Sequence, residues 1–114
     1  MDAGVLRESV GLFEGALDFA NLSAKRKNGN PVRTTVRNIF AAEVAERDGG
    51  YQIDITGDGF LYKMVRMMVG ASVDCARGRR GTDWIRAMLD RSAESEKCSA
   101  CAPAGGLYLV SVDY

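Results

Sequence analysis

The 114-residue sequence contains no histidine, only two prolines and a single tryptophan. Without histidine, a Ser-His-Asp triad, a histidine general base and a histidine-bearing zinc site are all excluded within this chain. An excess of charge of one sign is also missing, because 15 Lys and Arg residues balance 15 Asp and Glu residues. This balance excludes a histone-like basic protein, although it leaves room for a local basic patch.

Long apolar stretches are missing too, since no run approaches the roughly 18 residues that a membrane span requires. The first residues, Met1 to Gly4, lack the basic and apolar regions of a signal peptide. The sequence contains three cysteines, and this odd number argues against a secreted disulfide framework. We therefore expect an intracellular location, most simply the cytoplasm, and no association with a membrane.

Apolar residues at helical spacing predict three helices. In the first, Leu6, Val10, Phe13 and Leu17 recur at intervals of four, three and four residues, which places them on one face. Thr82 is the expected N-cap of the last helix, because its side chain can accept a hydrogen bond from a backbone amide. The predicted helices cover residues 5–19, 61–77 and 82–89.

Three strands are predicted over residues 36–47, 51–56 and 107–114. Asp48-Gly49-Gly50 is a hairpin signal that joins the first two strands. Because strands and helices occur together and the hairpin is antiparallel, the sequence predicts an α+β fold. We expect a single domain over residues 1–114, with a mainly antiparallel sheet and helices on one face. A sheet of so few strands leaves edges that a partner could cover.

Two segments concentrate positive charge. Residues 25–37 hold five basic residues and no acid, and residues 63–80 hold five against the single acid Asp74. Such a concentration is typical of phosphate binding, and an ordinary solvated surface is the alternative interpretation. The residues predicted to contact RNA are Lys25, Arg26, Lys27, Arg33, Arg37, Arg79 and Arg80.

Arg66 is the sharpest single candidate. It lies on the flank between the buried stripe and the solvent face of the predicted helix, just after a Gly-rich turn and Phe60. A guanidinium in such a place can bind a carboxylate or a phosphate with two parallel hydrogen bonds. An ordinary salt bridge within the domain is the alternative.

Cys98 and Cys101 form a CxxC pair, which can be a redox couple or half of a zinc site. Zinc would need two further ligands, and the only remaining cysteine is Cys75 on a predicted helix. A redox pair should open a helix after a strand, whereas this pair lies in a loop. We therefore interpret the two cysteines as incidental thiols, and expect no metal site. No GxGxxG or Walker pattern is present either.

Two longer motifs carry a resemblance to a known family. Residues 57–70 read Gly-Asp-Gly-Phe-Leu-Tyr-Lys-Met-Val-Arg-Met-Met-Val-Gly, and residues 102–114 read Ala-Pro-Ala-Gly-Gly-Leu-Tyr-Leu-Val-Ser-Val-Asp-Tyr. In this order they resemble the C-terminal half of the tRNA pseudouridine synthase A family, and weaker likenesses at 15–19 and 36–39 extend the resemblance over the whole chain. It implies half of the pseudouridine synthase fold, and an enzyme that isomerises uridine in the anticodon stem-loop of tRNA without a cofactor or metal.

The resemblance also implies residue roles. Arg66 corresponds to the arginine that pairs with the catalytic aspartate, Leu107 to the leucine that lines the uracil pocket, and Phe60 to a substrate-binding position. The family's Arg-(Thr/Ala)-Asp-x-Gly-Val-His-Ala motif, which supplies that aspartate from the N-terminal half, does not occur in this sequence. We therefore expect the isolated chain to be inactive, with tRNA and the missing N-terminal domain as partners and a homodimer as the complete enzyme. The alternatives are a non-catalytic RNA-binding module on the same fold and a protein-interaction domain that uses the sheet edge.

Overall fold

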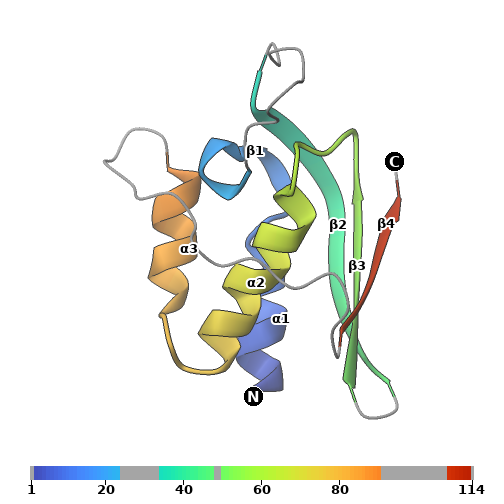
Figure 1. Ribbon diagram of the computed structural model, residues 1–114, viewed down its shortest axis with the longest axis vertical. Helices are drawn as coiled ribbons and strands as arrows, with labels where there is room; N and C mark the ends of the chain where they lie inside the picture. The colour runs from blue at the N-terminus through green and yellow to red at the C-terminus, as the bar shows by residue number, and fades with distance from the viewer. Residues whose placement is uncertain (1, 24–33, 48–49, 91–107, 114) are drawn as a thin grey trace.

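The computed structural model describes residues 2–23, 34–47, 50–90 and 108–113 (Figure 1). In chain order the elements are α1 (Ala3–Gly11), β1 (Gly15–Asp18), the 3-10 helix η1 (Ala20–Leu22), β2 (Val36–Arg47), β3 (Gly50–Gly57), α2 (Met64–Ala76), α3 (Thr82–Leu89) and β4 (Tyr108–Asp113). None of the helices in these ranges is both long enough and apolar enough to cross a membrane.

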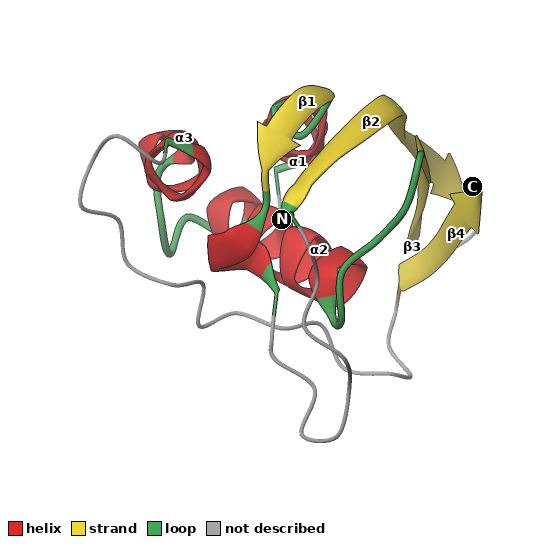
Figure 2. Ribbon diagram, turned by 90° about the horizontal axis from the view of Figure 1, so that it is seen from above, coloured by secondary structure: helices red, strands yellow, loops and turns green. Residues whose placement is uncertain are grey.

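The four strands form one sheet in the order β1-β2-β3-β4. The β1–β2 and β2–β3 pairs are antiparallel, whereas β4 runs parallel to β3. Seen from above, the sheet curves and the helices lie on its concave side, with α3 farthest from β4 (Figure 2). The predicted α+β class with a mainly antiparallel sheet is confirmed, and the parallel β4 is the one departure from antiparallel pairing in the described sheet.

The predicted hairpin is confirmed, because Arg47 at the end of β2 pairs with Gly50 at the start of β3. Near the start of β2 the register shifts between Ile39 and Ala41, which leaves Phe40 in a β-bulge with 58% of its surface exposed. A bulge inserts one extra residue and so breaks the period of two. Ile39 and Ala42 therefore both face the core although they are three residues apart, which explains the blurred alternation in the sequence of this strand.

The first predicted helix is wrong beyond Gly11, where α1 ends. Gly15 adopts φ +115°, a conformation that favours glycine, and the chain then continues as β1 instead of helix. The helix-like spacing of apolar residues in the sequence continues past Gly11 because Phe13 and Leu17 also face the core. Phe13 does so from a turn and Leu17 from β1. The spacing of apolar residues indicates which residues are buried. In this segment a helix followed by a strand gives the same spacing as one long helix.

The core lies between the concave face of the sheet and the three helices. The fully buried large side chains are Leu6, Val10, Phe13, Phe19, Leu22, Ile39, Ile53, Ile55, Met64, Met68, Ile85 and Met88. Helix α2 is central, and α1 lies antiparallel beside it, since the Asp2 amide donates a hydrogen bond of 2.8 Å to the Ala76 carbonyl. The third helix begins with Gly81 as its N-cap instead of the predicted Thr82, which is the first helical residue.

Candidate functional site

The turn between β3 and α2 is fastened to β2. The backbone amide of Asn38 donates to Asp58 Oδ1 at 3.0 Å, and the backbone amide of Asp58 donates to the backbone carbonyl of Asn38 at 3.1 Å. Gly57 is packed so closely there that a Cβ would lie 3.0 Å from the Asn38 carbonyl oxygen. These contacts fix the path of the chain from the sheet into α2.

The first turn of α2 carries positive charge where helices usually carry negative charge. Lys63 is the N-cap residue and Arg66 is the third residue of the helix, and both side chains are exposed. The first turn contains no acidic residue. Since the N-terminus of a helix already has a partial positive charge, two added cations are unfavourable there unless an anion binds. This end of α2 is therefore a candidate site for a carboxylate or a phosphate.

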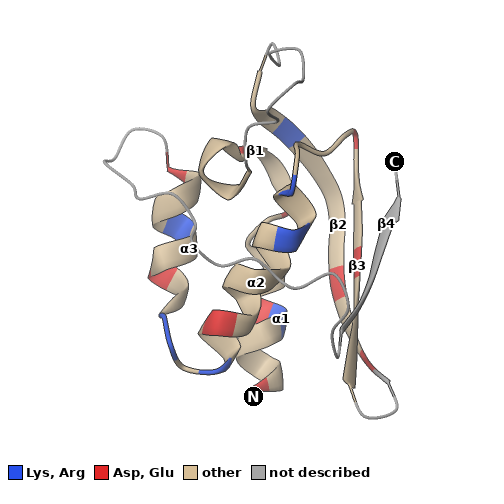
Figure 3. Cartoon of the chain, in the orientation of Figure 1, with Lys and Arg blue, Asp and Glu red and all other residues tan. Residues whose placement is uncertain are grey.

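Arg37 lies against the same turn from β2. Its Nη1 atom donates to the Thr34 and Val36 carbonyl oxygens, each at 2.7 Å. Its Nε atom lies 3.6 Å from the position that a Cβ at Gly59 would occupy. The Lys and Arg colouring accordingly reaches the upper end of β2 and the start of α2 together in Figure 3. The structure thus brings the predicted Arg37 and Arg66 to one end of the molecule.

Two aromatic side chains border this site. Phe60 is half-buried and packs against the core, so its ring is held by the protein interior. Tyr62 is 40% exposed, and Lys63 Nζ lies 5.6 Å from the centroid of its ring. An exposed aromatic ring beside a cation is typical of surfaces on which unpaired RNA bases stack. Tyr62 was missed by the sequence analysis, although its position off the buried stripe was a signal.

The predicted Arg79 and Arg80 lie at the opposite end of α2, in the connection to α3. With 13 residues at a rise of 1.5 Å, the helix separates the two ends by about 20 Å. Arg79 forms an ion pair with Asp74 at 3.4 Å, and the Arg80 guanidinium lies over the Trp84 ring at 4.7 Å. Arg79 therefore has an acidic partner within the domain, and Arg80 has an aromatic one.

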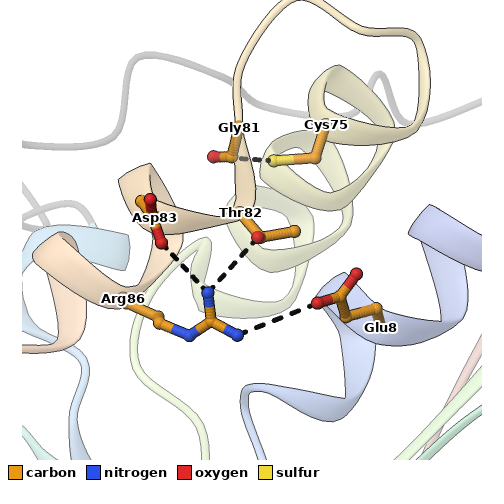
Figure 4. A network of polar contacts seen from close by, with 6 residues as sticks. All are labelled: Glu8, Cys75, Gly81, Thr82, Asp83 and Arg86. Carbon is orange, nitrogen blue, oxygen red and sulfur yellow. Dashed lines mark hydrogen bonds and ion pairs between the residues drawn. The ribbon is translucent and has the colours of Figure 1, made fainter.

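A polar network balances further charge at this lower end (Figure 4). Arg86 forms ion pairs with Asp83 at 3.1 Å and with Glu8 at 3.8 Å. Above them, the Cys75 thiol donates to the Gly81 carbonyl at 3.5 Å, and burial raises the pKa of this thiol. Acidic residues thus lie among the arginines at this end, whereas the first turn of α2 contains none.

Several predicted site residues lie outside the described residues. They are Leu107 of the expected uracil pocket, Lys25, Arg26, Lys27 and Arg33 of the first basic segment, and the pair Cys98 and Cys101. Of the predicted site residues that the structure describes, Arg37, Phe60 and Arg66 lie near the start of α2, and Arg79 and Arg80 lie beyond its other end. The structure adds Asp58, Tyr62 and Lys63 to the first group.

Comparison with known proteins defines the class to which this arrangement belongs. Residues 10–114 match the sequence model of the family described as tRNA pseudouridine synthase. The chain therefore belongs to the tRNA pseudouridine synthase family.

Individual relatives agree with this assignment. The whole chain is 32% identical to tRNA pseudouridine synthase A 1 of Protochlamydia amoebophila and 37% identical to tRNA pseudouridine synthase A of Syntrophotalea carbinolica, and covers 44% of each of these proteins. It is 35% identical to tRNA pseudouridine synthase A of Acetivibrio thermocellus, of which it covers 45%. The chain thus spans less than half the length of the curated relatives that it matches.

Proposed function

We propose that this chain is the C-terminal domain of a tRNA pseudouridine synthase that isomerises uridine in the anticodon stem-loop of tRNA. In this reaction the bond between C1′ and N1 of uridine breaks, the base turns, and a bond forms between C1′ and C5. The proton at C5 leaves to solvent and N1 gains a proton, so that no cofactor, metal or redox partner is needed. The catalytic aspartate comes from a part of the enzyme outside this sequence.

Arg66 is the residue that this domain contributes to the reaction. The observation that carries the proposal is its place in the first turn of α2, exposed, beside Lys63 and without an acid in that turn. A guanidinium remains charged at any relevant pH, so it keeps an approaching carboxylate ionised and oriented for attack. In a site closed to water, the same carboxylate without a counter-charge would be protonated more readily.

The remaining contacts bind the substrate. Leu107 lines the uracil pocket, and Phe60 is a further substrate-binding residue. Arg37 and Lys63 position phosphates at the same end as Arg66, because phosphate contacts fix the register of an RNA without reading its sequence. The basic segment that contains Lys25, Arg26, Lys27 and Arg33 extends this contact, with Arg79 and Arg80 as more distant ones. The complete enzyme is a homodimer that binds tRNA.

The test is an enzyme in which this chain replaces the matching segment of the Acetivibrio thermocellus relative, called the grafted enzyme below. We expect it to release tritium from tRNA labelled with [5-³H]uridine, whereas the 114-residue chain alone releases none. A grafted enzyme that binds tRNA as tightly as the parent relative but releases no tritium contradicts the proposal. That result would leave a non-catalytic RNA-binding module, the alternative on the same fold.

A further inference from the structure

We infer that Asp58 is a positioning residue, which holds Arg66 at the reaction site by fastening the start of α2 to β2. The inference rests on the proposed function of Arg66 and adds a residue to it. Asp58 lies eight positions before Arg66 and is itself exposed. Its role is therefore argued from its hydrogen bonds and from what else holds the first turn of α2.

The Asp58–Asn38 contact continues the sheet beyond its last regular pair. The β2–β3 ladder ends with Ile39 opposite Gly57. One residue farther, the Asp58 amide donates to the Asn38 carbonyl at 3.1 Å, and the Asp58 carboxylate accepts from the Asn38 amide at 3.0 Å. The side chain thus takes the place of a backbone carbonyl, and the turn leaves the sheet in a fixed direction.

The start of α2 packs into the core through Leu61 and Met64 but has no side-chain cap among the described residues. In the described part of the chain, the N-cap residue Lys63 makes no side-chain capping hydrogen bond. Lys63 also has φ +60°, a left-handed conformation that costs energy for any residue except glycine. A strained residue without a cap stays in place only when its surroundings hold it. Just upstream, the Leu61 backbone amide donates to Met64 Sδ at 3.4 Å within the same turn, whereas the hydrogen bonds of Asp58 join this turn to β2.

The packing around the turn makes this anchor effective. A Cβ at Gly57 would lie 2.9 Å from Ile39 Cδ1 and 3.0 Å from the Asn38 carbonyl oxygen, so the backbone passes close to β2 at this point. On the other side of Asp58, the Arg37 side chain runs along Gly59. The hydrogen bonds of Asp58 therefore fix the backbone between Gly57 and Gly59. The residues that follow, up to the first turn of α2, continue from this fixed point.

Hydrogen exchange of two variants of the chain tests the anchor. Hydrogen exchange at the Met64 and Met67 amides, which donate to the Leu61 and Lys63 carbonyls, reports the order of the first turn. We expect Asp58→Ala to speed this exchange at least severalfold. Asp58→Asn keeps the side-chain acceptor but removes the charge, so we expect exchange close to that of the unchanged protein. Unchanged exchange in Asp58→Ala would overturn the inference.

Asp2 offers a matched control. It is also exposed, and its Oδ1 atom accepts from the Val5 amide at 3.1 Å, but it caps α1. Asp2→Ala and Asp58→Ala should lower the melting temperature by similar amounts, because each removes one side-chain hydrogen bond to a backbone amide. In the grafted enzyme we expect kcat to fall roughly 10- to 100-fold for Asp58→Ala only, with KM for tRNA little changed.

A double-mutant cycle separates positioning from a direct role. If Asp58 acts through Arg66, Asp58→Ala lowers kcat in the unchanged background and lowers it little further in the Arg66→Ala background. Full additivity of the two effects would overturn the inference. If Arg66→Ala leaves kcat unchanged while Asp58→Ala still speeds amide exchange, the proposed role of Arg66 fails and the anchor at Asp58 stands. If Asp58→Asn lowers kcat as much as Asp58→Ala does, the charge of Asp58 is what matters, and the hydrogen-bond argument is wrong.

Discussion

Gly57 on β3 lies opposite Ile39 on β2, and the Ile39 Cδ1 atom is 2.9 Å from the position that a Cβ at Gly57 would occupy. This contact explains why glycine begins the turn that leads to α2. A side chain at Gly57 would also meet the Asn38 carbonyl oxygen at 3.0 Å, and a backbone atom cannot move aside as a side chain can. The close approach of the two strands therefore sets the origin of the turn that carries the candidate site.

This relationship predicts different tolerance at two neighbouring glycines. We expect Gly57→Ala to lower the free energy of unfolding by about 1 to 3 kcal/mol, the usual cost of overpacking. Gly59→Ala is the control, because its Cβ would meet Arg37 at 3.6 Å, an ordinary contact, and the expected change is within about 0.5 kcal/mol. Urea denaturation measures both variants. Equal stability of the two would contradict the packing described at Gly57.

Lys63 yields a second prediction, in which two variants differ in stability but both lose affinity for tRNA. At φ +60°, glycine is favoured over any residue with a Cβ, so we expect Lys63→Gly to be more stable than Lys63→Ala by roughly 1 kcal/mol. Both variants lose the same charge, and we expect both to bind tRNA less tightly than the unchanged chain. Thermal unfolding and filter binding measure the two effects. A stable Lys63→Gly variant that binds tRNA normally would show that the Lys63 charge does not contact RNA.

Much of the fold could be predicted from local patterns. The alternation over residues 51–56, the hairpin signal at Asp48-Gly49-Gly50 and the apolar stripe of α2 each arise within one segment. The structure confirms the strand, the pairing of Arg47 with Gly50 and the helix. Strand β1 could not be predicted in this way, because its identity depends on pairing with residues 36–39. Its apolar Leu17 fits a helix and a strand equally well, and only the partner strand decides between them.

The candidate site likewise contains residues that local patterns predict and one that depends on contacts between distant segments. Arg66 could be found from its flanking position in the helix and from the motif around it, and Arg37 from local charge. The role of Asp58 could not be found, because its hydrogen bond joins residues 20 positions apart. In the sequence, residues 63–80 form one basic segment, yet α2 places the two ends of this segment about 20 Å apart. Charge counted along a sequence does not reveal which cations share one surface.

That separation gives a third prediction, on the salt dependence of tRNA binding. Each phosphate contact that is lost reduces the slope of log affinity against log salt by about 0.7 to 0.9. We expect the double variant Lys63→Ala/Arg66→Ala to reduce the slope by about 1 to 2. Arg79→Ala/Arg80→Ala removes the same charge at the other end, where Arg79 is paired with Asp74, and should change the slope less. The opposite order would place the RNA at the α2–α3 connection.

Cys75 gives a fourth prediction, which concerns pH. Burial raises the pKa of this thiol, so the folded protein retains its proton at a pH where the unfolded chain has lost it. The contribution of Cys75 to stability is thus constant below the ordinary thiol range and falls as pH rises from the unfolded pKa toward the folded one. The measurement is the difference in unfolding free energy between a Cys98→Ser/Cys101→Ser protein and the same protein with Cys75→Ala, which cancels other titrating groups. In the first protein, iodoacetamide should also react slowly until urea unfolds it.

The last prediction concerns the pH profile of the grafted enzyme when Arg66 is changed. We expect Arg66→Ala to lower kcat by orders of magnitude with a modest loss of tRNA affinity, because the charge acts on the reacting carboxylate more than on binding. Losing a nearby cation also raises the pKa of that carboxylate. The acidic limb of the rate profile should therefore move to higher pH by about one unit or more.

Arg66→Lys is the matched variant in this experiment, because it keeps a positive charge but cannot form two parallel hydrogen bonds with a carboxylate. Its acidic limb should stay near that of the unchanged enzyme while its kcat falls, since ionisation of the carboxylate depends on the charge and its orientation on the hydrogen bonds. Tritium release from [5-³H]uridine-labelled tRNA across the pH range measures both variants. If Arg66→Ala shows a normal rate, or a reduced rate with an unmoved acidic limb, Arg66 does not act by holding the carboxylate ionised.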